Sequence, residues 1–379
     1  MVNIVIITPL LQNYRLSFYE KLSTLKNDYH LTVFYGVNYK EDGKAGYTGA
    51  TKFLSKGFRE YKFRILPFDM VFNRGMYSEL IKTDPDVIII LTSTGNMTYR
   101  RIISWAKRKG KKIIIWTSGW DPGRAKGIML SFKNRLVLSF FKKADFFLTY
   151  STYASRYVES MGIDKSIIET CYNGIEIDNL IKNTPDIIKT SKDIIRKYNL
   201  EDHITFLYVG GIIPEKRVDL LLDAFVELRK KFGNIKLLII GDGPLRTMVE
   251  NKLKLYNDPN IIYLGRIIEG VDPFFAASDC LVLPGAGGLA LNQAMFWKKP
   301  CIVSKADGTE DDLVIENITG YRFKENDLES LISAMSQRIQ AKEGKISFLS
   351  ENAYQIIVNK SNVNNMVQVF SRTIDRLVG

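Results

Sequence analysis

The sequence is poor in the residue types that build histidine-dependent and metal-dependent sites. Only two of its 379 residues are histidines, His30 and His203, and each stands at the polar lead into a strand-like run. A Ser-His-Asp triad, a Cys-His pair and a histidine zinc site are therefore disfavoured. Three cysteines in apolar surroundings read as reduced core thiols and indicate a cytoplasmic chain. They are Cys171, Cys280 and Cys301.

Long apolar runs and the common nucleotide loops are also missing. The longest continuous apolar run, Val87 to Leu91, is far shorter than the ~20 residues of a membrane span. Met1 is followed directly by Val2 and Asn3, without a basic leader, so no secretory signal is predicted. No GxGxxG follows the first predicted strand, and no GxxxxGK[ST] is present. Binding of NAD in the Rossmann manner is thus disfavoured, and a P-loop is excluded.

The composition is that of an ordinary globular protein, but its charge is one-sided. Hydrophobic residues make up 46% and charged residues 25%, and the length predicts two or three domains. Residues 1–173 carry 27 Lys and Arg against 14 Asp and Glu, whereas residues 174–379 carry 26 against 27. A basic excess confined to the first half would attract nucleic acid, an anionic membrane or a phosphorylated substrate. The alternative is a solvated basic face with no partner.

Strand-like apolar runs alternate with amphipathic stretches along the whole chain. In the first half the predicted strands cover residues 3–8, 31–35, 87–91, 112–116 and 146–149. In the second half they cover residues 205–209, 236–240, 261–264, 280–283 and 300–303. The pattern predicts two Rossmann-type halves in tandem, with a hinge near Asn173-Gly174, a connecting stretch over 174–200 and a final pair of helices after Ser347.

Two glycine-containing stretches follow predicted strands in the second half. The strand at 205–209 runs into Gly210-Gly211, and Lys216 and Arg217 stand just before the next helical stretch. The strand at 280–283 runs into Pro-Gly-Ala-Gly-Gly and a helix start, where backbone N-H groups and the helix dipole favour an anion. Together they predict a diphosphate held between a helix N-terminus and Lys216. The alternative is that the glycines only make tight turns and that Lys216 is solvated.

Five motifs follow one another in this half. They are V-G-G-x-x-P-E-K, L-L-I-I-G-D-G-P-L, L-V-L-P before a glycine loop and A-M, K-P-C-I-V-S, and N-I-T-G-Y. Their order resembles the carboxyl-terminal half of glycosyltransferase family 4, and Tyr172-Asn173-Gly174-Ile175 is similar to the end of the family's first domain. The resemblance is strongest from Phe206 to Phe323. It implies transfer of a sugar from a nucleotide donor on the second domain to an acceptor held mainly by the first.

The resemblance also implies the architecture. The fold class is α/β of the GT-B type, with two Rossmann-like doubly wound domains facing across a cleft that holds the active site. The implied domains are an acceptor-binding domain over 1–173, a donor-binding domain over 174–347, and helices over 348–379 that return to the first domain. The family mostly retains anomeric configuration and needs no divalent metal. No cofactor is expected, because the nucleotide-diphosphate sugar is a substrate.

Two departures from the family pattern bear on the donor site. The family usually has Arg where this chain has Gly211, so Lys216 is the part of an Arg and Lys clamp that remains, and Arg217 is expected to compensate. The family's paired glutamates fall on Gly285, which has no side chain to hold a sugar, and on Gln293, which can still hydrogen-bond ribose. The predicted donor-binding residues are Gly210, Gly211, Lys216, Arg217, Gly287, Gly288, Leu289, Ala290, Gln293 and Glu310.

The remaining predicted roles rest on single positions. Glu310 matches a family carboxylate near the nucleotide, or else is a helix N-terminal acid favoured by the macrodipole. Ser118 stands where related sequences often have His, and a hydroxyl is predicted to position a group rather than transfer a proton. The predicted catalytic residues are Lys216, Ser118 and Asp121. The acceptor-side candidates are Trp116, Trp120 and Arg15. The two tryptophans either form the floor of a sugar site or are core aromatics.

The resulting hypothesis is a cytoplasmic glycosyltransferase on the inner face of the membrane. Its predicted partners are a nucleotide sugar, a glycan or polyprenyl-linked acceptor in surface polysaccharide assembly, and an anionic membrane surface. The rival is a noncatalytic GT-B-like module that binds a nucleotide sugar or a membrane. A nucleic-acid site is disfavoured, since no arginine-aromatic repeat or known nucleic-acid fold supports it.

A basic segment from Arg124 to Lys143 is the predicted membrane contact. It has six cations and no acid, and apolar residues recur at helical spacing. The cations predict salt-sensitive binding to an anionic leaflet. The apolar face is expected either to insert into the lipid or to pack on the sheet of the first domain. The cations are Arg124, Lys126, Lys133, Arg135, Lys142 and Lys143, and the apolar face includes Met129, Phe132, Leu136 and Phe140.

Overall fold

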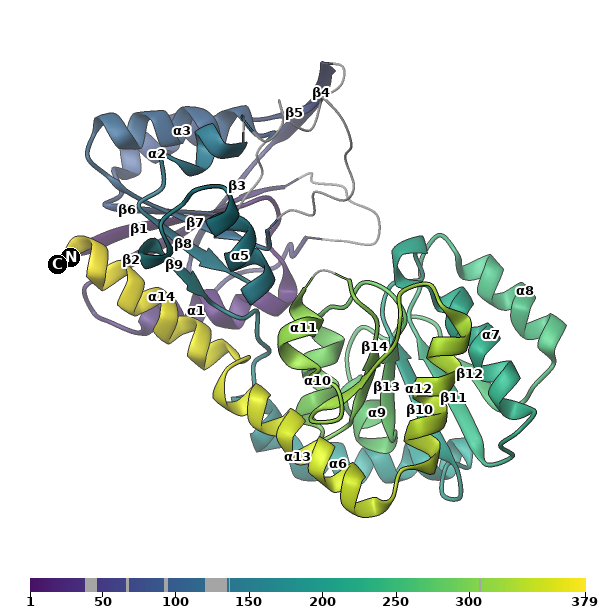
Figure 1. Ribbon diagram of the computed structural model, residues 1–379. Helices are drawn as coiled ribbons and strands as arrows, with labels where there is room; N and C mark the ends of the chain where they lie inside the picture. Colours follow the sequence, from purple (N-terminus) through teal and green to yellow (C-terminus); the bar gives the residue numbers. More distant parts are fainter. Residues whose placement is uncertain (38–45, 66–67, 92–94, 120–134, 136, 307) are drawn as a thin grey trace. The chain divides into compact units, whose positions relative to one another are not determined.

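The chain divides into two compact units, which are described separately. Unit 1 comprises Met1–Asn173 and Val363–Gly379, and unit 2 comprises Gly174–Asn362 (Figure 1). The computed structural model describes residues 1–37, 46–65, 68–91, 95–119, 135, 137–306 and 308–379, and the side chains of residues 64, 65, 68 and 69 are outside this description. The last segment of the chain therefore belongs with the first unit.

Unit 1 is built on a seven-stranded sheet in which every neighbouring pair is parallel. The strand order is β3-β2-β1-β6-β7-β8-β9. The strands are β1 (Val2–Thr8), β2 (Tyr29–Gly36), β3 (Leu54–Phe58), β6 (Val87–Leu91), β7 (Lys112–Thr117), β8 (Phe146–Thr149) and β9 (Ile168–Thr170). The central strands are continuous apolar runs because both faces of a parallel sheet are covered by helices.

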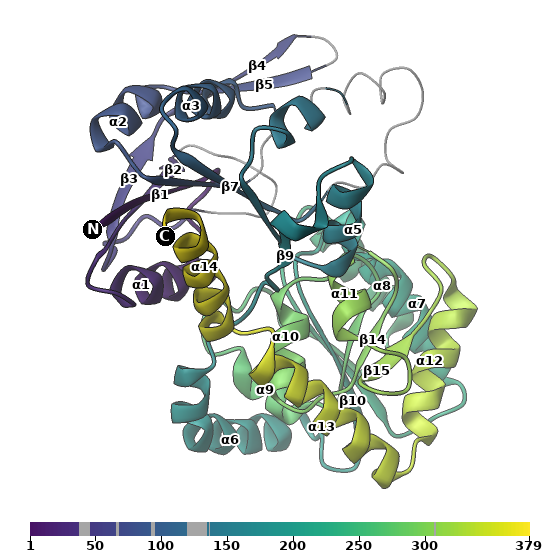
Figure 2. The same ribbon diagram turned by 60° about the vertical axis from the view of Figure 1, so that its left-hand side comes forward.

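Alternate residues of β1 show how the two faces of this sheet are covered. Ile6 packs in a cluster with Phe18 of α1 (Leu16–Thr24) and Phe370 of α14 (Val363–Val378). Ile7 packs in the opposite cluster with Tyr99 of α3 (Met97–Arg108). Figure 2 shows α1 and α14 side by side on one face of the sheet. The other helices of this unit are η1 (Asn13–Arg15), α2 (Met76–Thr83), α5 (Thr152–Ser160) and η3 (Lys165–Ile167).

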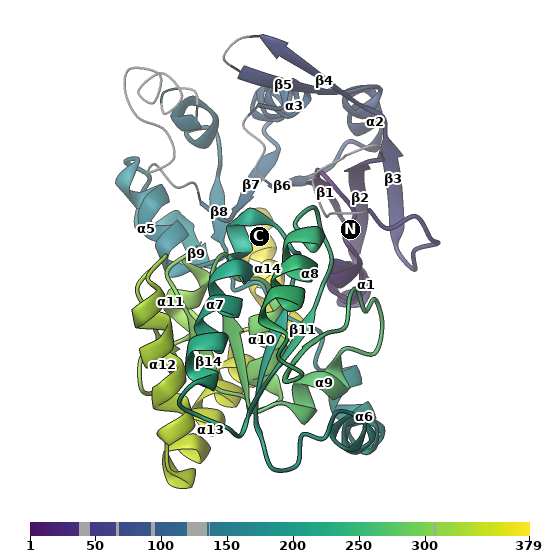
Figure 3. The same ribbon diagram turned by 90° about the vertical axis from the view of Figure 1, so that its right-hand side faces the viewer.

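A separate antiparallel hairpin extends from the helical layer of unit 1. Its strands are β4 (Glu60–Ile65) and β5 (Phe68–Asn73). The hairpin is a sheet of its own beside α3, away from the seven-stranded sheet, and Figures 1, 2 and 3 all show it extending beyond α2 and α3. Nothing in the sequence patterns predicted this element.

Unit 2 contains a six-stranded parallel sheet with the order β12-β11-β10-β13-β14-β15 (Figure 1). The strands are β10 (Ile204–Val209), β11 (Ile235–Ile240), β12 (Ile261–Tyr263), β13 (Cys280–Leu283), β14 (Cys301–Val303) and β15 (Gly320–Arg322). The helices are α6 (Asp178–Tyr198), η4 (Pro214–Lys216), α7 (Val218–Arg229), α8 (Arg246–Tyr256), α9 (Asp272–Ala277), α10 (Leu289–Phe296), α11 (Thr309–Leu313), α12 (Leu328–Gln340) and α13 (Glu343–Asn359).

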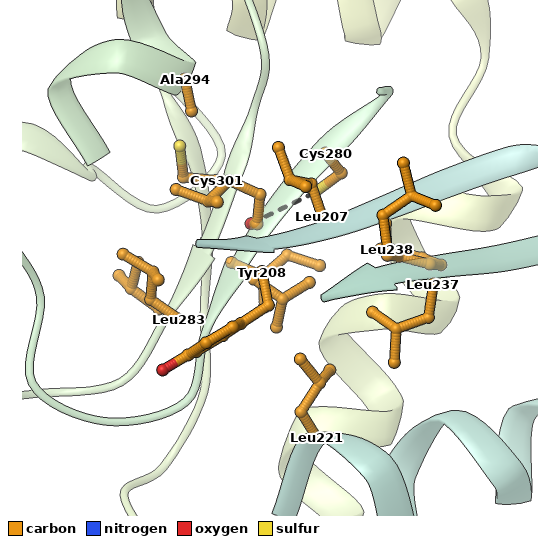
Figure 4. Packing of buried hydrophobic residues seen from close by; sticks show 14 of the residues in the cluster. Leu207, Tyr208, Leu221, Leu237, Leu238, Cys280, Leu283, Ala294 and Cys301 are labelled. Atoms are coloured by element: carbon orange, nitrogen blue, oxygen red, sulfur yellow. Dashed lines mark hydrogen bonds between the residues drawn. The ribbon is translucent and has the colours of Figure 1, made fainter. Parts of the chain in front are cut away.

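The core of unit 2 is assembled from the two faces of this sheet. Figure 4 shows Leu221 of α7 packing toward β10 and β11, while Ala294 of α10 lies beside Cys301 of β14. The ring of Tyr208 is completely buried, and its hydroxyl donates to the Gly211 carbonyl at 2.8 Å. The three cysteines are buried and free, as the sequence predicted. Among the described residues, no helix has the length and hydrophobicity that a membrane span requires.

Two predictions about connections differ from the structure. The stretch 174–200 was expected to be a connection, but it contains the 21-residue helix α6, whose Ile194 is buried in the core of unit 2. The return to unit 1 was expected from residue 348, but it begins at Val363. The reason is that α13 packs Leu349, Ala353 and Ile357 into the core of unit 2.

The two connections between the units lie next to each other. Ile175 forms a parallel β-bridge with Asn362. A Cβ atom on Gly174 would lie 2.4 Å from the Cα of Asn362, so a side chain at Gly174 would force the two segments apart. Asn292 of α10 donates from its side-chain amide to the Ser361 hydroxyl at 2.7 Å. The second connection is therefore tied to the helix that follows the glycine loop of β13.

Candidate functional site

Three loops meet at the carboxyl edge of the sheet in unit 2. The backbone N-H of Ile212 donates to the Asp242 carbonyl at 3.0 Å, and that of Ala286 donates to the Glu215 carbonyl at 2.9 Å. The loops follow the adjacent strands β11, β10 and β13, which is why they converge although they are distant in sequence. They span residues 210–217, 241–245 and 284–288.

Lys216 lies directly against the start of α10. Its ammonium group donates to the Ala286 carbonyl at 2.5 Å and to the Gly287 carbonyl. A Cβ atom on Gly288, the residue before α10, would lie 3.6 Å from Lys216 Nζ. A lysine cation and the positive end of a helix dipole at one place both favour a bound anion. The structure therefore brings together the two stretches that the sequence analysis paired.

The glycines of these loops differ in how closely they are packed. A Cβ atom on Gly285 would lie 2.1 Å from the Glu215 carbonyl oxygen and 3.0 Å from the Lys216 carbonyl carbon. A Cβ atom on Gly211 would meet only the Ile213 side chain, at 3.8 Å, and one on Gly287 would meet nothing within 4 Å. Gly285 is therefore required by the contact between the loops, whereas Gly211 leaves room for a side chain.

Arg217 and Gln293 differ from Lys216 in their contacts. The guanidinium of Arg217 pairs with the Asp219 carboxylate through two contacts of 3.3 Å, so its charge is partly neutralised by its own helix. Gln293 is half-buried in the second turn of α10, and its side chain makes no hydrogen bond within the described residues. Gln293 can therefore bind a ligand without breaking an internal contact, whereas Arg217 would have to leave Asp219.

Glu310 is a buried acid at the start of α11. One carboxylate oxygen accepts from the backbone N-H of Ala306 and from that of Gly308 at 3.2 Å. Its backbone carbonyl accepts from Arg322 at 3.0 Å. These contacts fit the helix N-terminal role that the sequence analysis left open, and they hold together the turn between β14 and α11.

Two of the acceptor-side candidates, Arg15 and Trp116, form a buried cluster with Tyr150. The Arg15 guanidinium lies over the Trp116 ring, 4.2 Å from its centroid, and donates to the Tyr150 hydroxyl. Arg15 is 3% exposed, and its Nε and Nη1 atoms have no hydrogen-bond partner in the described chain. Burial raises the pKa of Tyr150, which therefore stays protonated. No described carboxylate pairs with this guanidinium, and a buried positive charge of this kind makes this edge of the sheet electropositive.

The position of Trp116 decides between its two predicted roles, the floor of a sugar site and a core aromatic. Its side chain is completely buried and packs edge-on against Phe370 of α14, with ring centroids 4.9 Å apart. A ring in this position is a core aromatic and cannot form the floor of a sugar site by stacking. Ser118 lies exposed after β7, and the neighbouring Gly119 has a φ of 78°, which favours glycine. Trp120 and Asp121 lie outside the described residues.

The basic segment is described only from residue 135 and then from 137 onward. Val137, Phe140 and Phe141 are buried in the core cluster that contains α3. The described part of the apolar face therefore packs on unit 1 and does not insert into a lipid layer. The cations Arg124, Lys126 and Lys133 lie outside the described residues.

The loop 241–245 also lies at this sheet edge, although it was not among the predicted site residues. A Cβ atom on Gly243 would lie 2.5 Å from the Ile212 carbonyl oxygen, and Gly241 has a φ of 155°. The side-chain carboxylate of Asp242 accepts from the backbone N-H of Gly243 at 2.8 Å. The signal was available, because Gly-Asp-Gly directly follows the apolar strand β11, as the other two loops follow their strands.

Comparison with known proteins links this geometry to a fold. The structure of HepE from Anabaena in complex with UDP has a TM-score of 0.77 and 13% sequence identity, and the match covers 99% of this chain and 100% of that one. The match includes both Rossmann-like units and the C-terminal helix α14, which belongs to unit 1. The fold is GT-B. In this GT-B chain the three loops belong to the second of the two units.

Sequence relatives point to the same class of protein. The family of glycosyl transferases group 1 matches residues 190–355, all within unit 2. An uncharacterised glycosyltransferase of Methanocaldococcus jannaschii is 26% identical over 345 residues, which are 85% of each chain. The lipopolysaccharide 1,2-N-acetylglucosaminetransferase of Salmonella typhimurium is 26% identical over 212 residues, which are 52% of this chain and 54% of that protein. This GT-B chain is thus a homologue of glycosyltransferases.

Proposed function

We propose that this glycosyltransferase moves a sugar from a nucleotide-diphosphate donor to a glycan or lipid-linked glycan acceptor in surface polysaccharide assembly. The observation that carries the proposal is Lys216, whose ammonium group lies against the start of α10 beside a glycine loop. The match of residues 190–355 to the family of glycosyl transferases group 1 covers this site. Relatives named for lipopolysaccharide and capsular polysaccharide synthesis support the acceptor class.

The chemistry proposed for unit 2 is stabilisation of a leaving group. Breaking the bond between the sugar and the nucleotide diphosphate leaves additional negative charge on the terminal phosphate. Lys216 and the backbone N-H groups at the start of α10 would bind that phosphate and stabilise the charge as it develops. We further propose, from the resemblance to family 4, that the reaction retains anomeric configuration and uses no metal ion. The leaving phosphate would then take the proton of the acceptor hydroxyl.

Unit 1 is the proposed acceptor side. Arg15 gives the carboxyl edge of its sheet a buried positive charge, and Ser118 presents an exposed hydroxyl at the end of β7. A cation at this edge favours an acceptor that carries an anionic group, such as the phosphate of a lipid-linked glycan. Ser118 would orient the acceptor by hydrogen bonding, and Asp121 remains a catalytic candidate on sequence grounds. We place the reaction at the cytoplasmic face of a membrane.

Hydrolysis of sugar nucleotides without an acceptor tests the proposal against its noncatalytic rival. The protein is incubated with UDP-, GDP- and ADP-sugars, and the released nucleoside diphosphate is measured over time. We expect slow release from one donor class, because a site that stabilises the leaving phosphate also lets water attack. Repeating the assay with EDTA tests metal independence. Tight binding of a donor without any release, with or without candidate glycan acceptors, would favour the noncatalytic module.

Gln293→Ala is expected to weaken binding of the free nucleoside diphosphate about fivefold. The loss corresponds to about 1 kcal/mol for one hydrogen bond to a ribose hydroxyl. Gln293→Glu should bind as well as the wild type or better, because a carboxylate is the stronger acceptor. Isothermal titration calorimetry with UDP, GDP and ADP measures the affinities. Equal affinity of the wild type and Gln293→Ala would mean that this side chain faces solvent and not the ribose.

Gly211→Arg is expected to tighten nucleotide binding about tenfold. A Cβ atom at this position has only ordinary contact with Ile213, so the backbone tolerates a side chain. The new guanidinium would supply a second charge-assisted contact to the diphosphate, worth roughly 1.5 kcal/mol. Gly211→Gln is the matched neutral control and should show no gain. If both variants bind the nucleotide as the wild type does, the diphosphate is not within reach of this position.

A further inference from the structure

The β4–β5 hairpin has an apolar face that is exposed. Strand register pairs Tyr61 with Phe72 and Phe63 with Met70, and since side chains alternate along a strand these four lie on one face. Tyr61, Phe63 and Phe72 are each 41% exposed, whereas Met70 is half-buried. Apolar side chains gathered on one exposed face mark a candidate interaction surface.

The opposite face and the base of the hairpin are held by unit 1. The backbone N-H of Asn73 donates to the Thr98 hydroxyl at 2.9 Å, and Asn96 donates to the Asn73 side-chain oxygen at 2.7 Å. The backbone N-H of Val71 donates to the Gly95 carbonyl at 3.1 Å. Because α3 and the segment before it hold the polar side, the aromatic side is left facing outward. The aromatic face is thus presented on a fixed support.

Two arginines complete the aromatic face at the base of the hairpin. Arg59 directly precedes β4 and Arg74 directly follows β5, and the Arg74 backbone N-H donates to the Arg59 carbonyl at 3.0 Å. Hydrogen bonds from Arg74, and then from Arg59, lower the pKa of the Tyr61 hydroxyl. Along β4 the face therefore changes from a cation at Arg59, through an amphipathic tyrosine, to the apolar Phe63.

This order matches the change of polarity across the surface of a lipid bilayer. Phe63 is four residue steps beyond Arg59, a distance of about 13 Å at the usual strand rise. Arginine at the phosphate level, tyrosine at the interface and phenylalanine about 5–10 Å deeper is the arrangement of interfacial membrane anchors. The net charge of +13 over residues 1–173 suits anionic headgroups.

The size of the face argues against a protein partner as its occupant. Three aromatic side chains that are 41% exposed present on the order of 200–300 Å² of surface. A stable protein interface covers about 800 Å² on each partner. Membrane binding requires no minimum buried area of this kind, because each inserted side chain contributes independently and the surrounding cations add to the binding.

We propose that the β4–β5 hairpin is a membrane-insertion element, with Phe63 and Phe72 entering the lipid interface and Arg59 and Arg74 binding anionic headgroups. The element lies outside the basic segment 124–143, and the proposal does not depend on the transfer reaction. It assigns unit 1 a fixed orientation on the membrane, in which β4 and β5 run from the headgroup level into the lipid interface.

Cosedimentation with vesicles tests the proposal. The wild type is expected to bind vesicles of phosphatidylglycerol and phosphatidylcholine, and Phe63→Ser combined with Phe72→Ser should weaken this binding at least tenfold. The matched control combines Leu255→Ser with Ile268→Ser, which removes apolar side chains that are 77% and 73% exposed in unit 2. Control binding should equal that of the wild type, and sugar-nucleotide hydrolysis should be the same in all three proteins.

A thiol probe reports insertion directly. Cys171, Cys280 and Cys301 are buried, and burial raises the pKa of the Cys280 thiol to about 12, so a fluorescent label reacts selectively at an introduced cysteine. With anionic vesicles, the label on Phe63→Cys should shift to shorter wavelength and be quenched by brominated lipid. The label on Leu255→Cys should do neither.

Several outcomes would overturn the proposal. The wild type could fail to bind anionic vesicles, or the double serine variant could bind them as well as the wild type does. The label at position 63 could also show no spectral shift and no quenching. Sedimentation velocity supplies a further one: a dimer of the wild type that Phe63→Ser dissociates would assign the face to a second copy of the chain. Each of these results is independent of whether sugar nucleotides are hydrolysed.

Discussion

Replacing Lys216 by alanine is expected to lower sugar-nucleotide hydrolysis at least about thirtyfold while the protein stays folded. The ammonium group lies 2.5 Å from the Ala286 carbonyl in the loop that leads into α10, where the donor diphosphate is proposed to bind. A charge-assisted contact to a phosphate contributes roughly 2 kcal/mol, and more when the charge develops only in the transition state. The measurement is kcat/KM for release of the nucleoside diphosphate, with circular dichroism to check folding.

Arg217→Ala is the matched control for Lys216→Ala. The Arg217 guanidinium is paired with Asp219, so its removal should cost less than fivefold unless it leaves that pair to bind the donor. A loss as large as that of Lys216→Ala would mean that Arg217 compensates for the missing family arginine. Activity of Lys216→Ala within threefold of the wild type would remove Lys216 from the phosphate site.

Gly285→Ala is expected to have the other large effect, on stability and activity together. The added Cβ would lie 2.1 Å from the Glu215 carbonyl oxygen, a separation that no backbone accepts without moving. Overpacking of this kind lowers the free energy of unfolding by about 1–3 kcal/mol. Because the displaced turn also holds Lys216, hydrolysis should fall on the order of a hundredfold. Urea unfolding and the hydrolysis assay measure the two effects.

Two other glycines serve as controls for Gly285→Ala. Gly287→Ala, in the same loop, meets nothing within 4 Å and should change the free energy of unfolding by less than about 0.5 kcal/mol. Gly233→Ala, far from the loop in sequence and equally open, should change neither stability nor hydrolysis. If Gly285→Ala behaves like these two, the contact between the loops is not tight. The contact would then not explain why glycine replaces the family's glutamate.

Most of the sheet strands could be predicted from the sequence, because each central strand is an apolar run with turn residues at its ends. β6 and β8 have the predicted bounds, and β10 and β11 differ from prediction by one residue at their start. The short strands β3, β9 and β15 at the sheet edges were not predicted, since their residues are polar or too few to show a period. α6 was not predicted because its apolar residues are isolated among polar ones.

The candidate site was predictable where it depends on strand ends and not where it depends on contacts between distant residues. The pairing of Lys216 with the β13 loop followed from two motifs at one sheet edge. The burial of Trp116 could not be predicted, because it depends on Phe370, which is brought to the same cluster by the return of α14. A strand-end aromatic has the same local sequence whether it is covered or exposed.

The sequence alone determined the two Rossmann-like halves, their charge asymmetry and the position of the glycine loops after strands. Hydrophobic periods are read within a few residues, and charge and the order of elements are read directly along the chain. None of these properties requires knowledge of contacts between distant residues. Only the tertiary structure decided that Gly285 must be glycine, that α13 and α14 belong to different units, and that the aromatic face of the β4–β5 hairpin faces outward. Each of these properties depends on which distant segments pack against one another and on which surfaces they leave exposed.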